Sequence, residues 1–185
     1  LLGLGFLLAG MLASAGQVVG WNSLWGGNTL GLILRVWIGP VYVAAHLTFP
    51  KNSLPKYRKS ITNVFGLISS VLTILVLVSA WMPSPGVLTV SDSIVVDLRR
   101  AAQIFFIISF LVGITLLVYN RIYSKDAEVR RQTNVVLWGN VLGFIPYLVF
   151  VVLPYTFFSV QYTGGLISLV FLILVPLSYI YVIYQ

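Results

Sequence analysis

The stretch that decides the fold runs from Arg121 to Pro154 and reads RIYSKDAEVRRQTNVVLWGNVLGFIPYLVFVVLP. A short basic loop leads into an apolar run of about twenty residues, which is interrupted by Gly139, Gly143 and Pro146. A helical run of this length spans the roughly 30 Å hydrocarbon core of a bilayer. The Lys and Arg residues beside it mark the cytoplasmic side, because cytoplasmic loops carry an excess of these cations. The stretch therefore predicts a membrane helix and its orientation.

The composition extends this prediction to the whole chain. Of the 185 residues, 59% are hydrophobic and 8% are charged, whereas a soluble domain carries about 25% charged residues. Such a chain cannot cover its own surface in water, so the sequence predicts an integral membrane protein in contact with the lipid bilayer. The sequence contains no cysteine, which excludes disulfides, cysteine-ligated metal or iron–sulfur centres and thiol catalysis.

The net charge of +7 comes from basic residues whose positions along the chain indicate the membrane topology. Eight of the eleven basic residues lie in two short loops, Lys51–Lys59 and Arg121–Arg131. Such loops face the cytoplasm and secondarily form a patch for anionic lipid. The basic residues are not spread as a binding face, so we expect no nucleic-acid partner.

The apolar segments predict an all-α, polytopic transmembrane helix bundle of about six helices, which forms a single domain over residues 1–185. With both basic loops in the cytoplasm, the N- and C-termini lie there too, and the loops 21–28, 83–100 and 154–163 face outward. The expected location is the bacterial cytoplasmic (inner) membrane. Because the first residue is Leu and no cleavable signal pattern follows, we expect the chain to start inside a longer gene product. The expected spans cover residues 1–20, 29–49, 61–82, 101–119, 133–153 and 164–184, each to within a few residues.

Three arginines outside the basic loops, together with Trp37, are candidate ligand- or anion-site residues. Arg35 lies inside the second expected span; it either snorkels to the outer interface or faces inward. Facing inward, it would pair with Asp92 or Asp97 or bind an anionic ligand. Arg99 and Arg100 lie on the outer side, against the positive-inside trend, either as interfacial anchors or as an anion site. The residues expected to read a signal are Trp21, Trp25, Arg35, Trp37, Arg99 and Arg100.

His46 is the only histidine, and it lies near the cytoplasmic end of the second expected span. A single membrane histidine either ligates a haem or a chlorophyll axially, hydrogen-bonds a neighbouring helix, or sits at the interface. No second ligand is visible in the sequence, so we predict no metal site.

Small and kinking residues mark expected helix contacts. Gly139 and Gly143 form a G-x-x-x-G pair, which lets helices approach closely, and Asn140 between them can hydrogen-bond a neighbouring helix. Each mid-helix proline frees a backbone carbonyl and kinks its helix, which either shapes the bundle statically or provides a hinge. These prolines are Pro40, Pro146 and Pro176.

The patterns of enzymes and transporters are missing from the sequence. No expected span contains a carboxylate, whereas proton or sodium coupling normally needs one. There is no Gly-rich phosphate loop, serine elbow, paired-histidine helix or metal cluster. We therefore expect no catalytic residue and no enzymatic activity within these residues, and we disfavour a transporter or channel.

Two segments resemble a known family. The sequence E-V-R-R-Q-T-N-V-V-L-W-G, followed by G-F-I-P-Y and L-P, is similar to the late membrane segments of bacterial multi-span, competence-sensor-like histidine kinases. The H-L-T-F-P ending of the second expected span, with the basic, proline-containing loop after it, resembles another part of those membrane regions. Together the segments cover about a quarter of the chain, and the remainder matches only in hydropathy. The resemblance implies a membrane sensing region whose last helix leads into cytoplasmic signalling and kinase modules of a longer gene product.

Two functions remain open on the sequence. The first is the sensory, signal-transducing membrane region of a two-component sensor kinase, in which no cofactor is expected. The alternative is an accessory transmembrane subunit of a larger photosynthetic or respiratory complex, with a structural role or a tetrapyrrole, carotenoid or lipid held against its aromatic surface. Accordingly, the expected protein partners are other membrane subunits or a second copy of the chain.

Overall fold

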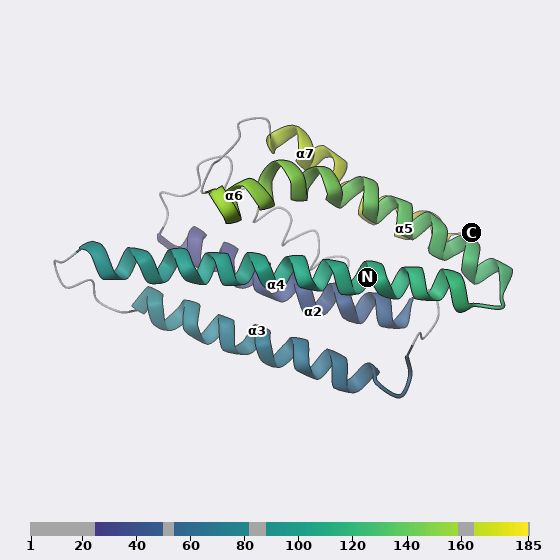
Figure 1. The fold of residues 1–185 in the computed structure, drawn as a ribbon, viewed down its shortest axis with the longest axis horizontal. Helices are drawn as coiled ribbons and strands as arrows, with labels where there is room; N and C mark the ends of the chain where they lie inside the picture. Colours follow the sequence, from purple (N-terminus) through teal and green to yellow (C-terminus); the bar gives the residue numbers. More distant parts are fainter. Residues whose placement is uncertain (1–24, 50–53, 82–87, 159–164, 185) are drawn as a thin grey trace. The chain divides into compact units, whose positions relative to one another are not determined.

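The computed structural model describes residues 25–49, 54–81, 88–158 and 165–184, and these are almost entirely helical, with no strand among them (Figure 1). The all-helical prediction is confirmed for this part of the chain. The helices are α2 (Trp25–Thr48), α3 (Arg58–Trp81), α4 (Leu88–Tyr123), α5 (Ala127–Tyr147), the π-helix η2 (Leu148–Val152), α6 (Leu153–Phe158), α7 (Gly165–Phe171) and α8 (Leu174–Ile183).

Three stretches of these helices are long and apolar enough to cross a membrane: Arg58–Val78, Arg100–Tyr123 and Ala127–Phe158. The apolar helical stretches Leu32–Thr48 and Leu174–Ile183 are shorter. Length and composition thus indicate a membrane protein. The number of six spans stays a prediction, and the expected first span, residues 1–20, lies outside the described residues.

Helix boundaries differ from the expected spans at two connections. The outer connection expected over 83–100 is helical from Leu88 onward, because α4 runs without a break to Tyr123. The turn expected over 154–163 begins as helix α6, which ends at Phe158. Hydropathy measures only the apolar part of a helix, so the charged turns at the start of α4 do not register in it.

The chain divides into two compact units, which we describe separately. Unit 1 comprises Leu1–Val41 and Lys59–Ser109, and unit 2 comprises Tyr42–Arg58 and Phe110–Gln185. Helices α2 and α4 therefore contribute to both units. The single domain over residues 1–185 remains a prediction.

In unit 1, two hydrogen bonds join α2 to α3. The Ser69 hydroxyl donates to the Val36 carbonyl at 3.1 Å, and the Trp37 indole N–H donates to the Thr73 hydroxyl at 3.1 Å. Helix α3 otherwise exposes large apolar side chains, among them Leu67 at 67%. This surface is compatible with lipid, because hydrocarbon does not penalise an exposed Leu.

Unit 2 is built around α5, whose buried residues recur every three or four positions and form one stripe along the helix. The opposite face exposes large apolar side chains, including Trp138 at 53% and Leu142 at 52%. The buried stripe consists of Thr133, Val136, Leu137, Asn140, Gly143, Phe144 and Tyr147.

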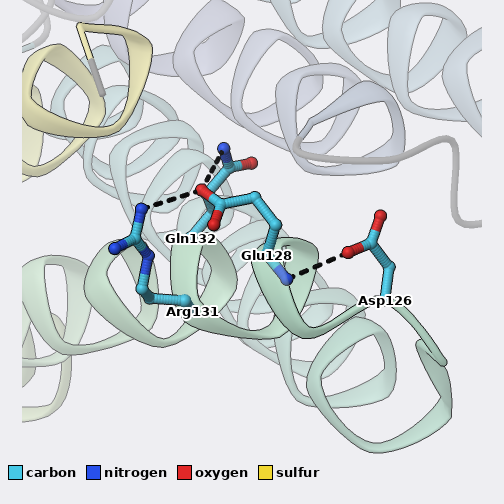
Figure 2. Close-up of polar contacts among 4 residues, drawn as sticks. All are labelled: Asp126, Glu128, Arg131 and Gln132. Atoms are coloured by element: carbon cyan, nitrogen blue, oxygen red, sulfur yellow. Dashed lines mark hydrogen bonds and ion pairs between the residues drawn. The ribbon is translucent and has the colours of Figure 1, made fainter.

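Helix α5 begins with a set of local polar contacts (Figure 2). The Asp126 carboxylate caps the helix by accepting the Glu128 backbone N–H at 2.9 Å. The Glu128 carboxylate accepts hydrogen bonds from Arg131 at 3.0 Å and from Gln132 at 3.1 Å. These contacts explain why the helix starts at Ala127, before the apolar run begins.

Two glycines allow α8 to pack closely against α5. A Cβ added at Gly139 would collide with the Ser178 side chain, and one added at Gly143 would lie 2.6 Å from Val175 Cγ2 and 3.0 Å from the Phe171 carbonyl oxygen. The structure thus places the terminal helix against the face that carries the G-x-x-x-G pair. The pairing of Gly139 with Ser178 and of Gly143 with Val175 makes the two helices antiparallel.

Prolines alter α5 and the terminal helix pair in different ways. Pro146 lies near the end of α5, and the wider π-helix starts two residues later at Leu148. The break between α7 and α8 lies at Leu172–Ile173, four residues before Pro176. Because Pro176 has no N–H to offer the Leu172 carbonyl, this carbonyl accepts the Val175 N–H instead, at 3.2 Å. The span expected over 164–184 is therefore two short helices.

The glycine contacts predict opposite results for two alanine substitutions. Gly139→Ala should lower the free energy of unfolding by about 1–3 kcal/mol, because the new methyl group has no room beside Ser178. Gly66→Ala is the control, since a Cβ there meets nothing within 4 Å; it should leave stability unchanged or raise it by up to about 1 kcal/mol. Detergent-titrated unfolding followed by circular dichroism measures both. Equal effects of the two substitutions would contradict the described packing.

Candidate functional site

The candidate site is a cluster of four buried polar side chains in unit 2, which we call the polar cluster: Tyr42 and His46 on α2, Asn140 on α5 and Tyr179 on α8. Their exposed fractions are 2%, 0%, 0% and 6%. Tyr42 and His46 are four residues apart and so share one face of α2. Three separate helices thus place polar groups at one point in an apolar interior.

Both ring nitrogens of His46 have partners. Nδ1 lies 2.7 Å from the backbone carbonyl oxygen of Tyr42, and a carbonyl oxygen can only accept, so Nδ1 carries a proton. In the neutral ring Nε2 is then the acceptor, and the Tyr179 hydroxyl donates to it at 2.7 Å. This hydrogen bond joins α2 to α8.

Asn140 closes the cluster from α5. Its side-chain oxygen accepts the Tyr42 hydroxyl at 2.9 Å, and its Nδ2 donates to the Val136 carbonyl at 2.7 Å. Every member of the polar cluster is therefore linked to at least one member on another helix.

Aromatic rings enclose the Tyr42 end of the polar cluster. The Tyr42 ring centroid lies 4.1 Å from that of His46, 5.9 Å from that of Phe110 and 5.6 Å from that of Phe144. Gly113 on α4 lies against the same ring, where a Cβ would overlap the Tyr42 ring carbons. The tyrosine is thus fixed on several sides, which orients its hydroxyl toward Asn140.

This geometry bears on the expected roles of His46. A tetrapyrrole bound axially would have to displace the Tyr179 hydroxyl from Nε2 or the Tyr42 carbonyl from Nδ1. The hydrogen bond to a neighbouring helix, one of the two other roles that the sequence allows, is the contact present here. Within the described residues, no group of three or more His, Cys, Asp or Glu side chains could hold a metal ion.

The other expected site residues have separate surroundings. Trp37 donates to Thr73, and the guanidinium of Arg100 lies 3.9 Å from the Asp97 carboxylate on the surface of α4. Arg35 is half-buried on α2. The Arg99 side chain lies outside the described set, so a joint anion site of these residues stays a prediction.

The remaining expected residues lie on or near the terminal helices of the described chain. Trp25 begins α2, but its side chain is outside the described set, as is all of Trp21. Pro40 is buried within the continuous helix α2, and Pro176 is buried on α8. Neither position carries an observed hinge, so that role stays a prediction.

An open pocket of about 630 Å³ lies beside the π-helix in unit 2. Among the described residues that line it, Ser168 is the one polar residue. The lining residues are Pro146, Val149, Phe150, Pro154, Ile167, Ser168 and Phe171.

Sequence reasoning identified His46 and the hydrogen-bonding capacity of Asn140 but missed both tyrosines. Tyr42 could have been found from its position four residues before the only histidine, which places both on one helix face. Tyr179 is one of ten tyrosines and has no local signal, because its role depends on which helices are neighbours.

Comparisons of the chain with protein-family models, with curated proteins and with solved structures found no match. The similarity to sensor kinases therefore rests on the quoted sequence segments alone.

Removal of one hydroxyl tests the polar cluster. Tyr179→Phe should lower the free energy of unfolding by about 1–3 kcal/mol, because it leaves His46 Nε2 buried without its donor. Tyr184→Phe is the control, since Tyr184 is 86% exposed, and it should change stability by less than about 0.5 kcal/mol. Detergent-titrated unfolding measures both.

A double-mutant cycle sharpens this test. If the Tyr179 hydroxyl and His46 interact directly, the effects of Tyr179→Phe and His46→Leu are not additive, with a coupling of about 0.5–3 kcal/mol. Strict additivity would show that the two side chains act independently and would refute the contact.

Proposed function

We propose that this chain is the sensory and signal-transducing membrane region of a bacterial sensor kinase, a bundle of about six spans in the inner membrane with both termini in the cytoplasm. The quoted similarity to competence-sensor-like histidine kinases supports this proposal. In this proposal residues 1–185 transmit a signal and contain no catalytic residue.

The observation that carries the proposal is the hydrogen bonding of α2 to both α8 and α5 through the polar cluster. A movement of α8 along its axis separates Tyr179 from His46, and hydrocarbon offers no replacement partner. Intermediate positions of α8 are therefore unfavourable, and we expect the helix to occupy a few distinct positions along its axis. A signal that binds two such positions with different affinity shifts the population between them.

The direction of α8 supports an output on the cytoplasmic side. Because α8 is antiparallel to α5, its C-terminal end lies toward Ala127, where α5 begins. The basic residues Arg121, Lys125, Arg130 and Arg131 flank this end of α5. By the positive-inside rule it is the cytoplasmic end, so a displacement of α8 would be transmitted to whatever follows it in the cytoplasm.

Cysteine labelling tests the orientation. The chain has no cysteine, so Lys125→Cys introduces a single reactive thiol at an exposed position. In intact cells an impermeant maleimide should leave this thiol unlabelled, and permeabilisation should expose it. Labelling in intact cells at the level of the permeabilised sample would place the basic loop outside and overturn the proposed direction of signalling.

The signalling role is tested in the complete gene product. The reading frame after Gln185 should encode a kinase module, and Tyr179→Phe should change its basal autophosphorylation in membranes several-fold, because α8 loses its fixed position. Tyr184→Phe, which removes an exposed hydroxyl at the end of the same helix, should leave the rate unchanged. A reading frame without a signalling module, or equal rates for a folded Tyr179→Phe protein and the wild type, would refute the proposal.

A further inference from the structure

The connection between α4 and α5 carries a dense group of charges on its surface. We call residues 121–131 the basic turn; its cations are Arg121, Lys125, Arg130 and Arg131, and all four are exposed. Its acids are Asp126 and Glu128, so four cations and two acids leave a net charge of +2.

The two acids are occupied by contacts within the start of α5 (Figure 2). The Asp126 carboxylate accepts the backbone N–H of Glu128 at 2.9 Å, and the Glu128 carboxylate lies 3.0 Å from the guanidinium of Arg131. Within the part of the chain that the structure describes, the side chains of Arg121, Lys125 and Arg130 make no ion pair with a carboxylate. Three exposed cations thus have no counter-charge among the described residues.

The location of the basic turn determines which partner these cations meet. It joins the membrane-long stretches Arg100–Tyr123 and Ala127–Phe158 through only three residues, so it must lie at a bilayer surface. Two exposed tyrosines, Tyr119 just before the basic turn and Tyr123 within it, have ring centroids 4.6 Å apart. Exposed tyrosines at the end of a membrane helix are typical of the headgroup level.

We propose that the basic turn is a binding surface for the headgroups of anionic phospholipids, with Arg121, Lys125 and Arg130 as the residues that contact the lipid phosphate. Charge complementarity selects this partner, because the phosphate of an anionic headgroup supplies the counter-charge that the chain lacks here. Arg131 has a different role: its bond to Glu128 keeps that carboxylate away from the lipid. The proposal is independent of the signalling function.

The test compares lipid preference in the full chain. The protein is placed in nanodiscs that contain phosphatidylglycerol and phosphatidylcholine, and the ratio of retained lipids is measured by native mass spectrometry. The wild type should retain phosphatidylglycerol preferentially. Each of Arg121→Gln, Lys125→Gln and Arg130→Gln should reduce this preference, by roughly fivefold per cation, and raised salt should weaken it.

Two further variants make the result specific. Arg121→Lys keeps the positive charge at the same position of the basic turn, and it should leave the preference unchanged. Glu128→Gln removes an acid from the turn and should increase the preference. The proposal fails if the wild type shows no preference, if Arg121→Lys loses the preference as Arg121→Gln does, or if a soluble acidic peptide, but not phosphatidylglycerol, binds in an Arg130-dependent manner.

Discussion

Hydrocarbon provides no hydrogen-bonding partners, and this constraint determines where the polar groups of the described helices lie. Ser70, Ser109 and Thr115 each donate to a carbonyl four residues back on their own helix. Such bonds satisfy a hydroxyl locally without joining two helices. The polar cluster is different because its partners lie on α2, α5 and α8, and so the same requirement for satisfied polar groups fixes three helices relative to one another.

Close approach and polar contact depend on each other in unit 2. Gly139 and Gly143 bring the α8 backbone against α5, and Asn140 lies between them in sequence. The Asn140 amide oxygen accepts the Tyr42 hydroxyl on α2, and the Tyr179 hydroxyl on α8 bonds to His46, also on α2. The glycines therefore set the distance between α5 and α8, and the polar side chains join both of these helices to α2.

The sequence predicted the helical class and much of the chemistry, but not the pairing. Long apolar runs with few charges allow little besides membrane helices, so α2 to α5 were foreseeable. The break before Pro176 was only half foreseeable, because a proline predicts a lost hydrogen bond but not whether the helix kinks or stops. The contact between His46 and Tyr179 joins residues 133 positions apart, and no local pattern encodes it.

The π-helix after Pro146 has a consequence for the segment that follows it. A π-turn holds one more residue than an α-turn, and one residue corresponds to about 100° of rotation around a helix axis. The extra residue thus sets the rotation of α6 about its axis. In this orientation Thr156 is buried, whereas Phe157 and Phe158 are exposed. A chain that lost one residue here would turn the threonine toward the acyl chains, so the bulge and the polarity of that position should change together in evolution.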